Sequence, residues 1–131
     1  MLSLYTRVPQ TLWRAGFYSC LVAVFVLALG SSNVQVISTG WDKANHVLAF
    51  SVLAFLLIHA HHLGRSKAFA LLIVIGAVIE VLQSFTPNRY AEWYDLIADG
   101  LGAVLGISIA MATKSLALRF NRARNPIADQ P

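Results

Sequence analysis

Four long apolar stretches, separated by short polar connections, limit most strongly what this chain can fold into. They run through residues 12–29, 47–58, 68–85 and 94–112, and polar residues 42–46 lead directly into the second. About 20 apolar residues in a helix span the hydrocarbon core of a bilayer. The chain has 131 residues, of which 12% are charged, whereas a soluble domain carries about 25% charge. The sequence therefore predicts an all-α integral membrane bundle of four transmembrane helices.

Polar segments at the two ends of the chain divide it into three parts. Residues 1–14 form an N-terminal segment, residues 15–113 the four-helix transmembrane domain, and residues 114–131 a basic tail. The first apolar stretch has a second interpretation, because its basic start and Ala28-Leu29-Gly30 resemble a signal peptide with its cleavage site. We expect a retained helix, since the preceding segment is long and aromatic residues flank the stretch.

Basic residues predict how the helices are oriented. Nearly all Lys and Arg lie in the N-terminal segment, in the turn around residue 65 and in the tail, while the other two connections hold only Lys43 and Arg89. Loops rich in Lys and Arg remain in the cytoplasm, so both termini are expected there (N-in/C-in), in a multi-pass protein of the cytoplasmic (inner) membrane. We expect the aromatic residues to form an outer belt (Trp41, Tyr90, Trp93, Tyr94) and an inner belt (Trp13, Phe17, Tyr18).

The same charges bear on the partners of the protein. Its formal net charge is +4, but no continuous soluble basic face is available for nucleic acid. Membrane lipids are the expected partners, because a basic tail that lies on the inner leaflet attracts anionic lipid; the alternative for the tail is a disordered anchor that only fixes the orientation. Four helices also expose much lipid-facing surface, so a homo-oligomer is an open alternative.

Acids and an amide interrupt the apolar stretches near the outer side of the membrane. Ionisable groups at this depth are costly, so they indicate a functional site. The second helix begins outside, the third ends outside and the fourth begins outside, which brings their polar residues to one level. We expect a ligand pocket open to the outer leaflet, and the alternative is a salt-bridge network that only holds helix ends together. The pocket residues are Asp42, Lys43, His46, Glu80, Gln83, Arg89, Asp95 and Asp99.

Spacing predicts that the acids of the fourth helix point into the bundle. Asp95, Asp99, Gly102 and Gly106 are separated by four, three and four residues, so they lie on one helical face. Small residues at such a spacing are typical of closely packed membrane helices. We therefore assign Gly102 and Gly106 to helix packing.

These residues, in this order, resemble the VanZ family, which is named for a glycopeptide-resistance protein that lowers susceptibility to teicoplanin. The resemblance covers residues 42–106 and implies a small multi-helix membrane protein, with glycopeptide tolerance as an implied role. Ile79 and Asp99 depart from the pattern, because many relatives have Asp and Asn there, which argues against a strict Asp95–Asp99 acid–base pair. The matching segments are Asp42-Lys43-x-x-His46-x-x-x-Phe50-x-x-Leu53, Glu80-x-x-Gln83-x-Phe85-x-Pro87-x-Arg89 and Asp95-x-x-x-Asp99-x-x-Gly102-x-x-x-Gly106.

Metal binding has weaker support in the sequence. His46 with Glu80 and Asp99 has suitable donors for a divalent ion, but Lys43 and Arg89 compete for the carboxylates, so we predict neither a metal nor a cofactor. A second group, His59, His61 and His62, has no Cys or carboxylate near it and is interpreted as a solvated turn.

We predict a non-enzymatic protein whose outer pocket binds the head group of an envelope lipid or of a lipid-linked cell-wall precursor. Arg89 and Lys43 would contact its anionic group. No Ser stands in a Gly-x-Ser-x-Gly setting, and no catalytic residue is assigned. Two alternatives remain: a membrane enzyme that uses His46 with a carboxylate as an acid–base pair, and a scaffold without a ligand.

Overall fold

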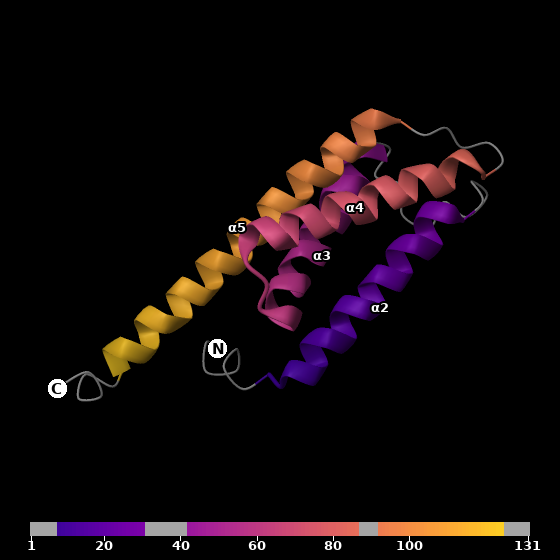
Figure 1. Cartoon of the computed structure of the whole chain (residues 1–131). Coiled ribbons are helices and arrows are strands. Elements are labelled where there is room, and N and C mark those ends of the chain that lie inside the picture. Colours follow the sequence, from indigo (N-terminus) through magenta and orange to yellow (C-terminus); the bar gives the residue numbers. More distant parts are fainter. Residues whose placement is uncertain (1–7, 31–41, 87–91, 125–131) are drawn as a thin grey trace.

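The computed structural model describes residues 8–30, 42–86 and 92–124, and these residues form four helices without a strand. The prediction of an all-α bundle of four membrane-spanning helices is confirmed, because each helix is long and apolar enough to cross a membrane. The helices are α2 (Gln10–Leu29), α3 (Asp42–His61), α4 (Arg65–Ser84) and α5 (Trp93–Arg124), as Figure 1 shows.

Each helix differs in its bounds from the apolar stretch that predicted it. The largest difference is in α5, which continues to Arg124, so the first part of the predicted tail is helical. Residues 114–119 include Lys, Leu, Ala and Arg, which are all strong helix formers. Polar side chains therefore end the apolar stretch there without ending the helix. The division of the chain into three segments stays a prediction.

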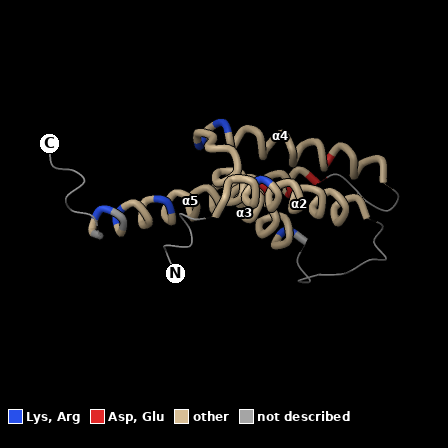
Figure 2. The backbone as a smooth tube through the Cα atoms, turned by 90° about the horizontal axis from the view of Figure 1, so that it is seen from below, with Lys and Arg blue, Asp and Glu red and all other residues tan. Residues whose placement is uncertain are grey.

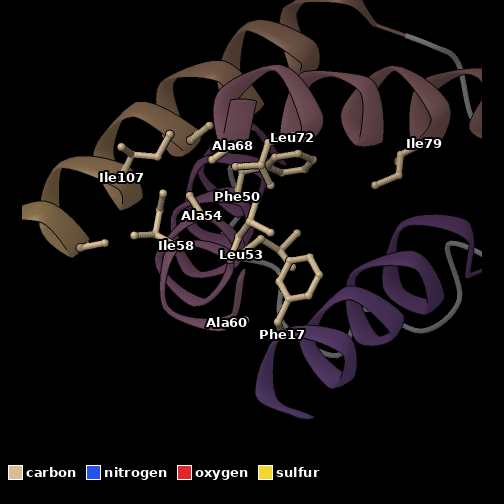
Figure 3. Close-up of a cluster of buried hydrophobic side chains, with 13 residues drawn as sticks. Phe17, Phe50, Leu53, Ala54, Ile58, Ala60, Ala68, Leu72, Ile79 and Ile107 are labelled. Carbon is tan, nitrogen blue, oxygen red and sulfur yellow. The ribbon is translucent and has the colours of Figure 1, made fainter. Parts of the chain in front are cut away.

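α3 lies at the centre of the bundle. It packs most extensively against α5, while α2 packs mainly on α3 and buries a single side chain. Figure 3 shows Phe50, Leu53 and Ile58 of α3 facing the apolar side chains of the other three helices. Most of the large apolar side chains that remain exposed lie on the outer faces of the helices, where a bilayer would cover them.

Phe17, which is predicted to belong to the inner aromatic belt, has its side chain inside the bundle. Its side chain is only 4% exposed and belongs to the apolar core. Its ring packs edge-on against His61, with 5.6 Å between the ring centroids. Phe17 therefore faces α3 rather than lipid, and its depth in the membrane stays a prediction.

Two glycines allow α5 to approach the backbone of α3. A Cβ atom at Gly106 would overlap the backbone oxygen of Ser51 and lie 2.7 Å from the Cβ of Ala54. A Cβ atom at Gly102 would overlap the backbone oxygen of Val47. Ser51 Oγ adds a polar link, since it lies 3.1 Å from the oxygen of Gly102 and 2.6 Å from that of Val47. This contact sets how α3 and α5 are rotated toward each other.

Side chains of α2 and α5 hold the C-terminal end of α3. Gln10 donates from Nε2 to the backbone oxygens of His59 and Ala60. Lys114 Nζ donates to the oxygen of Ile58 at 2.9 Å. The last carbonyls of a helix lack intrahelical partners and carry partial negative charge, so these donors satisfy them and fix this end of the bundle.

The three histidines at this end do not converge. His59 is 4% exposed and donates from Nδ1 to the oxygen of Phe55 at 2.7 Å. His61 packs on Phe17, whereas His62 Nε2 lies 3.0 Å from Oε1 of Gln10. The interpretation as a solvated turn is wrong for His59, because α2 covers its ring.

Candidate functional site

Polar side chains of α3, α4 and α5 meet at the opposite end of the bundle. Figure 2 shows the acids gathered where α4 ends and α5 begins, and the cations of the α4 start and of the α5 C-terminal half at the other end. We call this group the polar layer, and its members are Lys43, His46, Glu80, Glu92, Asp95 and Asp99.

His46 and Asp99 form the most buried pair of the layer. The Nδ1 atom of His46 lies 2.9 Å from Oδ1 of Asp99, whose side chain is fully buried. Asp99 Oδ2 lies beside Gly76, where a Cβ atom would be 2.5 Å from it. In the neutral imidazole one nitrogen donates and the other accepts. A carboxylate at Nδ1 favours the neutral tautomer that carries its proton there and leaves Nε2 as the acceptor.

Asp95 lies on the other side of the His46 ring. Its Oδ2 is 3.8 Å from His46 Nε2, and its Oδ1 is 3.6 Å from Nζ of Lys43. Both separations exceed hydrogen-bond length, so these are ion-pair distances. Lys43 makes its hydrogen bond to Oε2 of Glu92 at 3.0 Å. The side chains of Lys43 and Glu92 are 43% and 55% exposed, against 8% for Asp95, so the lysine lies at the rim and Asp95 inside.

Glu80 completes the interior of the layer from α4. Its side chain is buried, and Oε2 accepts a hydrogen bond from the backbone N–H of Glu92 at 3.0 Å. One ligand atom each from Glu80, His46 and Asp95 lies within 4.8 Å of the others. Three separate helices therefore direct charged side chains to one small volume.

Three carboxylate oxygens in this volume lack a hydrogen bond. Glu80 Oε1, Asp95 Oδ1 and Asp99 Oδ2 are buried and have no hydrogen-bond partner within residues 8–30, 42–86 and 92–124. A buried polar group without a partner costs about 1–3 kcal/mol, and more when it is charged. A layer that served only to hold helices together would not favour this arrangement.

The charges of the described side chains are also unbalanced. Four carboxylates, from Glu80, Glu92, Asp95 and Asp99, face a single lysine and one histidine. Carboxylates this close repel one another. The layer as described therefore favours a bound group that carries positive charge or hydrogen-bond donors.

Only part of the predicted pocket lies in the polar layer. The predicted residues found there are Lys43, His46, Glu80, Asp95 and Asp99. The Asp42 side chain and Arg89 lie outside the described residues. Gln83 shares a face with Glu80, but its Nε2 donates to the backbone oxygen of Ala28 at 3.0 Å and so ties the end of α4 to the end of α2.

Two participants were missing from the sequence prediction. Glu92 binds Lys43 through its side chain and Glu80 through its backbone. Gly76 leaves room for the Asp99 carboxylate. A signal existed for Gly76, because it lies four residues before Glu80 and so on the same helical face. Glu92 lies in the polar turn, where spacing does not indicate direction.

A shallow groove of about 350 Å³ lies away from the polar layer, between the first turn of α4 and the middle of α5. Its lining is mostly apolar and contains no acid, which makes it a poor candidate for polar chemistry. The lining residues are Arg65, Ser66, Phe69, Val104, Ile107 and Ser108.

Comparison with known proteins identifies one family. The family model described as VanZ/LLP1 matches residues 8–116. The match includes α2, which lay outside the resemblance seen in residues 42–106, and it contains every residue of the polar layer. No curated protein and no solved structure matches the chain.

Proposed function

The chain belongs to the VanZ/LLP1 family and is a membrane protein with four apolar helices, and from this premise we propose that its polar layer binds the head group of a cell-envelope lipid or of a lipid-linked cell-wall precursor. The observation that carries the proposal is the set of buried carboxylate oxygens in Glu80, Asp95 and Asp99 that have no hydrogen bond to a described residue. A ligand that donates hydrogen bonds to them would offset the cost of burying them.

Envelope head groups offer the chemistry that this layer requires. Sugar hydroxyls, amides and ammonium groups donate hydrogen bonds, and Glu80 and Asp95 would accept them. The phosphate of such a lipid would lie at the rim, where Lys43 is partly exposed and cations bind phosphate oxygens. Arg89, outside the described residues, would be the second cation for the phosphate.

Location and phenotype follow as part of the same proposal. With both termini in the cytoplasm, the polar layer lies at the outer leaflet of the inner membrane, where lipid-linked precursors present their head groups. The link to teicoplanin tolerance rests on the family name. It predicts that expression of the chain lowers teicoplanin susceptibility and that Glu80→Gln, expressed at an equal level, does not.

Binding to purified lipids tests the proposal. The wild type, Glu80→Gln and Lys67→Gln would be placed in nanodiscs and titrated with phosphatidylglycerol, phosphatidylethanolamine, undecaprenyl phosphate and a lipid-linked disaccharide peptide. We expect one of these lipids to raise the unfolding temperature of the wild type and of Lys67→Gln, whose lysine lies at the start of α4, but not of Glu80→Gln. Equal responses of all three proteins, or none to any lipid, would refute head-group binding in the layer.

One observation favours a second function, a membrane enzyme acting on such a head group. Asp99 lies 2.9 Å from Nδ1 of His46, and a carboxylate that orients a histidine through this nitrogen is typical of a general base. The test is incubation of labelled envelope lipids with purified wild type and His46→Gln. Product formed by the wild type alone would establish catalysis, and binding without product would leave the binding protein as the function.

A further inference from the structure

The interior of the polar layer has the donor set of a metal site. His46 Nε2 and Asp95 Oδ2 are 3.8 Å apart, too far for a hydrogen bond. Two ligands of one tetrahedral zinc ion, each about 2.1 Å from the metal, are about 3.4 Å apart. The ligand atoms of His46, Glu80 and Asp95 all lie within 4.8 Å of one another. Movements of about 1 Å by these side chains would bring all three to coordination distance.

Asp99 supplies the outer partner that metal-bound histidines have. A histidine that binds a metal through one nitrogen almost always donates its other N–H to a carboxylate, a carbonyl or water. Here Asp99 Oδ1 lies 2.9 Å from His46 Nδ1, and its side chain is fully buried. Asp99 therefore orients the ring so that Nε2 points toward Asp95. The sequence suggested Asp99 as a ligand, but the structure places it behind the ring.

A buried oxygen of Glu80 without a hydrogen bond to a described residue points to the same site. Glu80 is 8% exposed, and its Oε1 is buried without a hydrogen bond to any described residue. Asp95 is 6% exposed, and its oxygen without such a bond is Oδ1, the one that faces Lys43. Lys43 does not take the place of a cation in the centre. It lies at the rim, bonds to Glu92 at 3.0 Å and approaches Asp95 only through Oδ1, at 3.6 Å, so that Oδ2 remains directed at His46.

We infer that His46, Glu80 and Asp95 bind one divalent transition-metal ion, best matched by Zn²⁺, and that Asp99 positions His46 for it. Imidazole with carboxylates suits Zn²⁺, whereas Mg²⁺ and Ca²⁺ prefer oxygen ligands alone. Three protein ligands leave a fourth position open, as in zinc sites that bind a further oxygen ligand. Metal binding can be measured without lipid, but it uses the carboxylates of Glu80 and Asp95 that the proposed function assigns to the head group. With the ion bound, an anionic head group would instead contact the ion at its open position.

Metal titration in the absence of lipid tests this inference. The full chain would be purified in detergent, treated with a chelator, and titrated with Co²⁺ by visible absorption and with Zn²⁺ by calorimetry. We expect one equivalent of Co²⁺ to bind to the wild type with visible bands of nitrogen and oxygen ligation, and Zn²⁺ to displace it. Failure of the wild type to bind either ion saturably at micromolar concentration would overturn the inference, whatever the lipid experiment shows.

Variants locate the ion. Glu80→Gln and Asp95→Asn each remove a charged ligand and should abolish the Co²⁺ bands. Asp99→Asn leaves the three ligands in place and should weaken affinity by about 10–100-fold, the effect of losing an outer partner. His62→Gln, at the opposite end, is the control and should bind as the wild type does.

Two results would contradict this assignment. Wild-type affinity in folded Glu80→Gln and Asp95→Asn would exclude their carboxylates. Loss of the bands in His62→Gln would place the ion at the histidines near the end of α3. If a ligand variant does not remain folded, Asp99→Asn and the wild-type titration decide, because unchanged affinity in Asp99→Asn also refutes the arrangement.

Discussion

Replacing Gly106 by alanine tests the contact that holds α3 against α5. The added Cβ atom would overlap the backbone oxygen of Ser51 and lie 2.7 Å from the Cβ of Ala54. Neither group is the end of a flexible side chain, so the helices themselves must separate. Gly100, on the same helix, is the matched control. Its added Cβ would meet only Cδ1 of Ile73, at an ordinary contact distance of 3.5 Å.

The magnitude follows from two opposing effects. Forcing an extra methyl group into a packed interface costs about 1–3 kcal/mol, and replacing glycine by alanine within a helix stabilises it by about 1 kcal/mol. Gly106→Ala should therefore lose up to about 2 kcal/mol, while Gly100→Ala should gain up to about 1 kcal/mol from helix propensity alone. At about 3–4 °C per kcal/mol for a chain of this size, the two unfolding temperatures should differ by roughly 3–12 °C.

The assay is thermal unfolding of the wild type and both variants in one detergent, followed by circular dichroism. Co²⁺ affinity provides a second measurement, because separation of α3 from α5 would also move His46 away from Asp99. We expect Gly106→Ala to lose both stability and Co²⁺ affinity, and Gly100→Ala to retain both. Equal unfolding temperatures for the two alanine variants would refute the close approach of the helices.

Three further predictions concern the polar layer and the membrane topology. Glu80→Gln should unfold at the wild-type temperature or above it, because the amide oxygen keeps the hydrogen bond from the Glu92 N–H while a buried charge is removed. Unchanged or higher stability is typical of a charge kept for function at the expense of stability. A loss of several degrees would show instead that the charge holds the helices together. Gly76→Ala should displace the Asp99 carboxylate, whose Oδ2 would lie 2.5 Å from the new Cβ, and so weaken Co²⁺ binding, whereas wild-type affinity would contradict the placement of Asp99. In intact cells producing cysteine-free chains with one added cysteine, a membrane-impermeant maleimide should label Glu92→Cys but not Ser66→Cys, and the reverse pattern would refute the N-in/C-in orientation.

The number and type of the helices could be predicted from the sequence. Burial of an unpaired backbone in lipid is so unfavourable that an apolar stretch of sufficient length has almost no alternative to a helix. The level at which polar residues meet was also predictable, because helices that alternate in direction bring the start of α3, the end of α4 and the start of α5 to one side. Composition and order along the chain are sufficient for both conclusions.

The roles within the polar layer were decided only by the packing of the helices. Asp95 and Asp99 share one helical face, and they differ by about 40° of rotation and about 6 Å of rise. Although the two residues are only four positions apart in the sequence, this difference places Asp99 at Nδ1 of His46 and Asp95 near Nε2.

The rotation of α5 against α3 depends on which atoms touch where the helices cross. Gly102 and Gly106 allow their backbones to meet, and Gly76 of α4 leaves space for the carboxylate of Asp99. Sequence periodicity shows that these residues share faces, but not which face of a neighbouring helix they meet, because that choice depends on the shapes of all the packed side chains together. The sequence by itself therefore determined the four membrane helices and the end at which their charges meet, and the tertiary structure alone decided which atoms of those charges face one another.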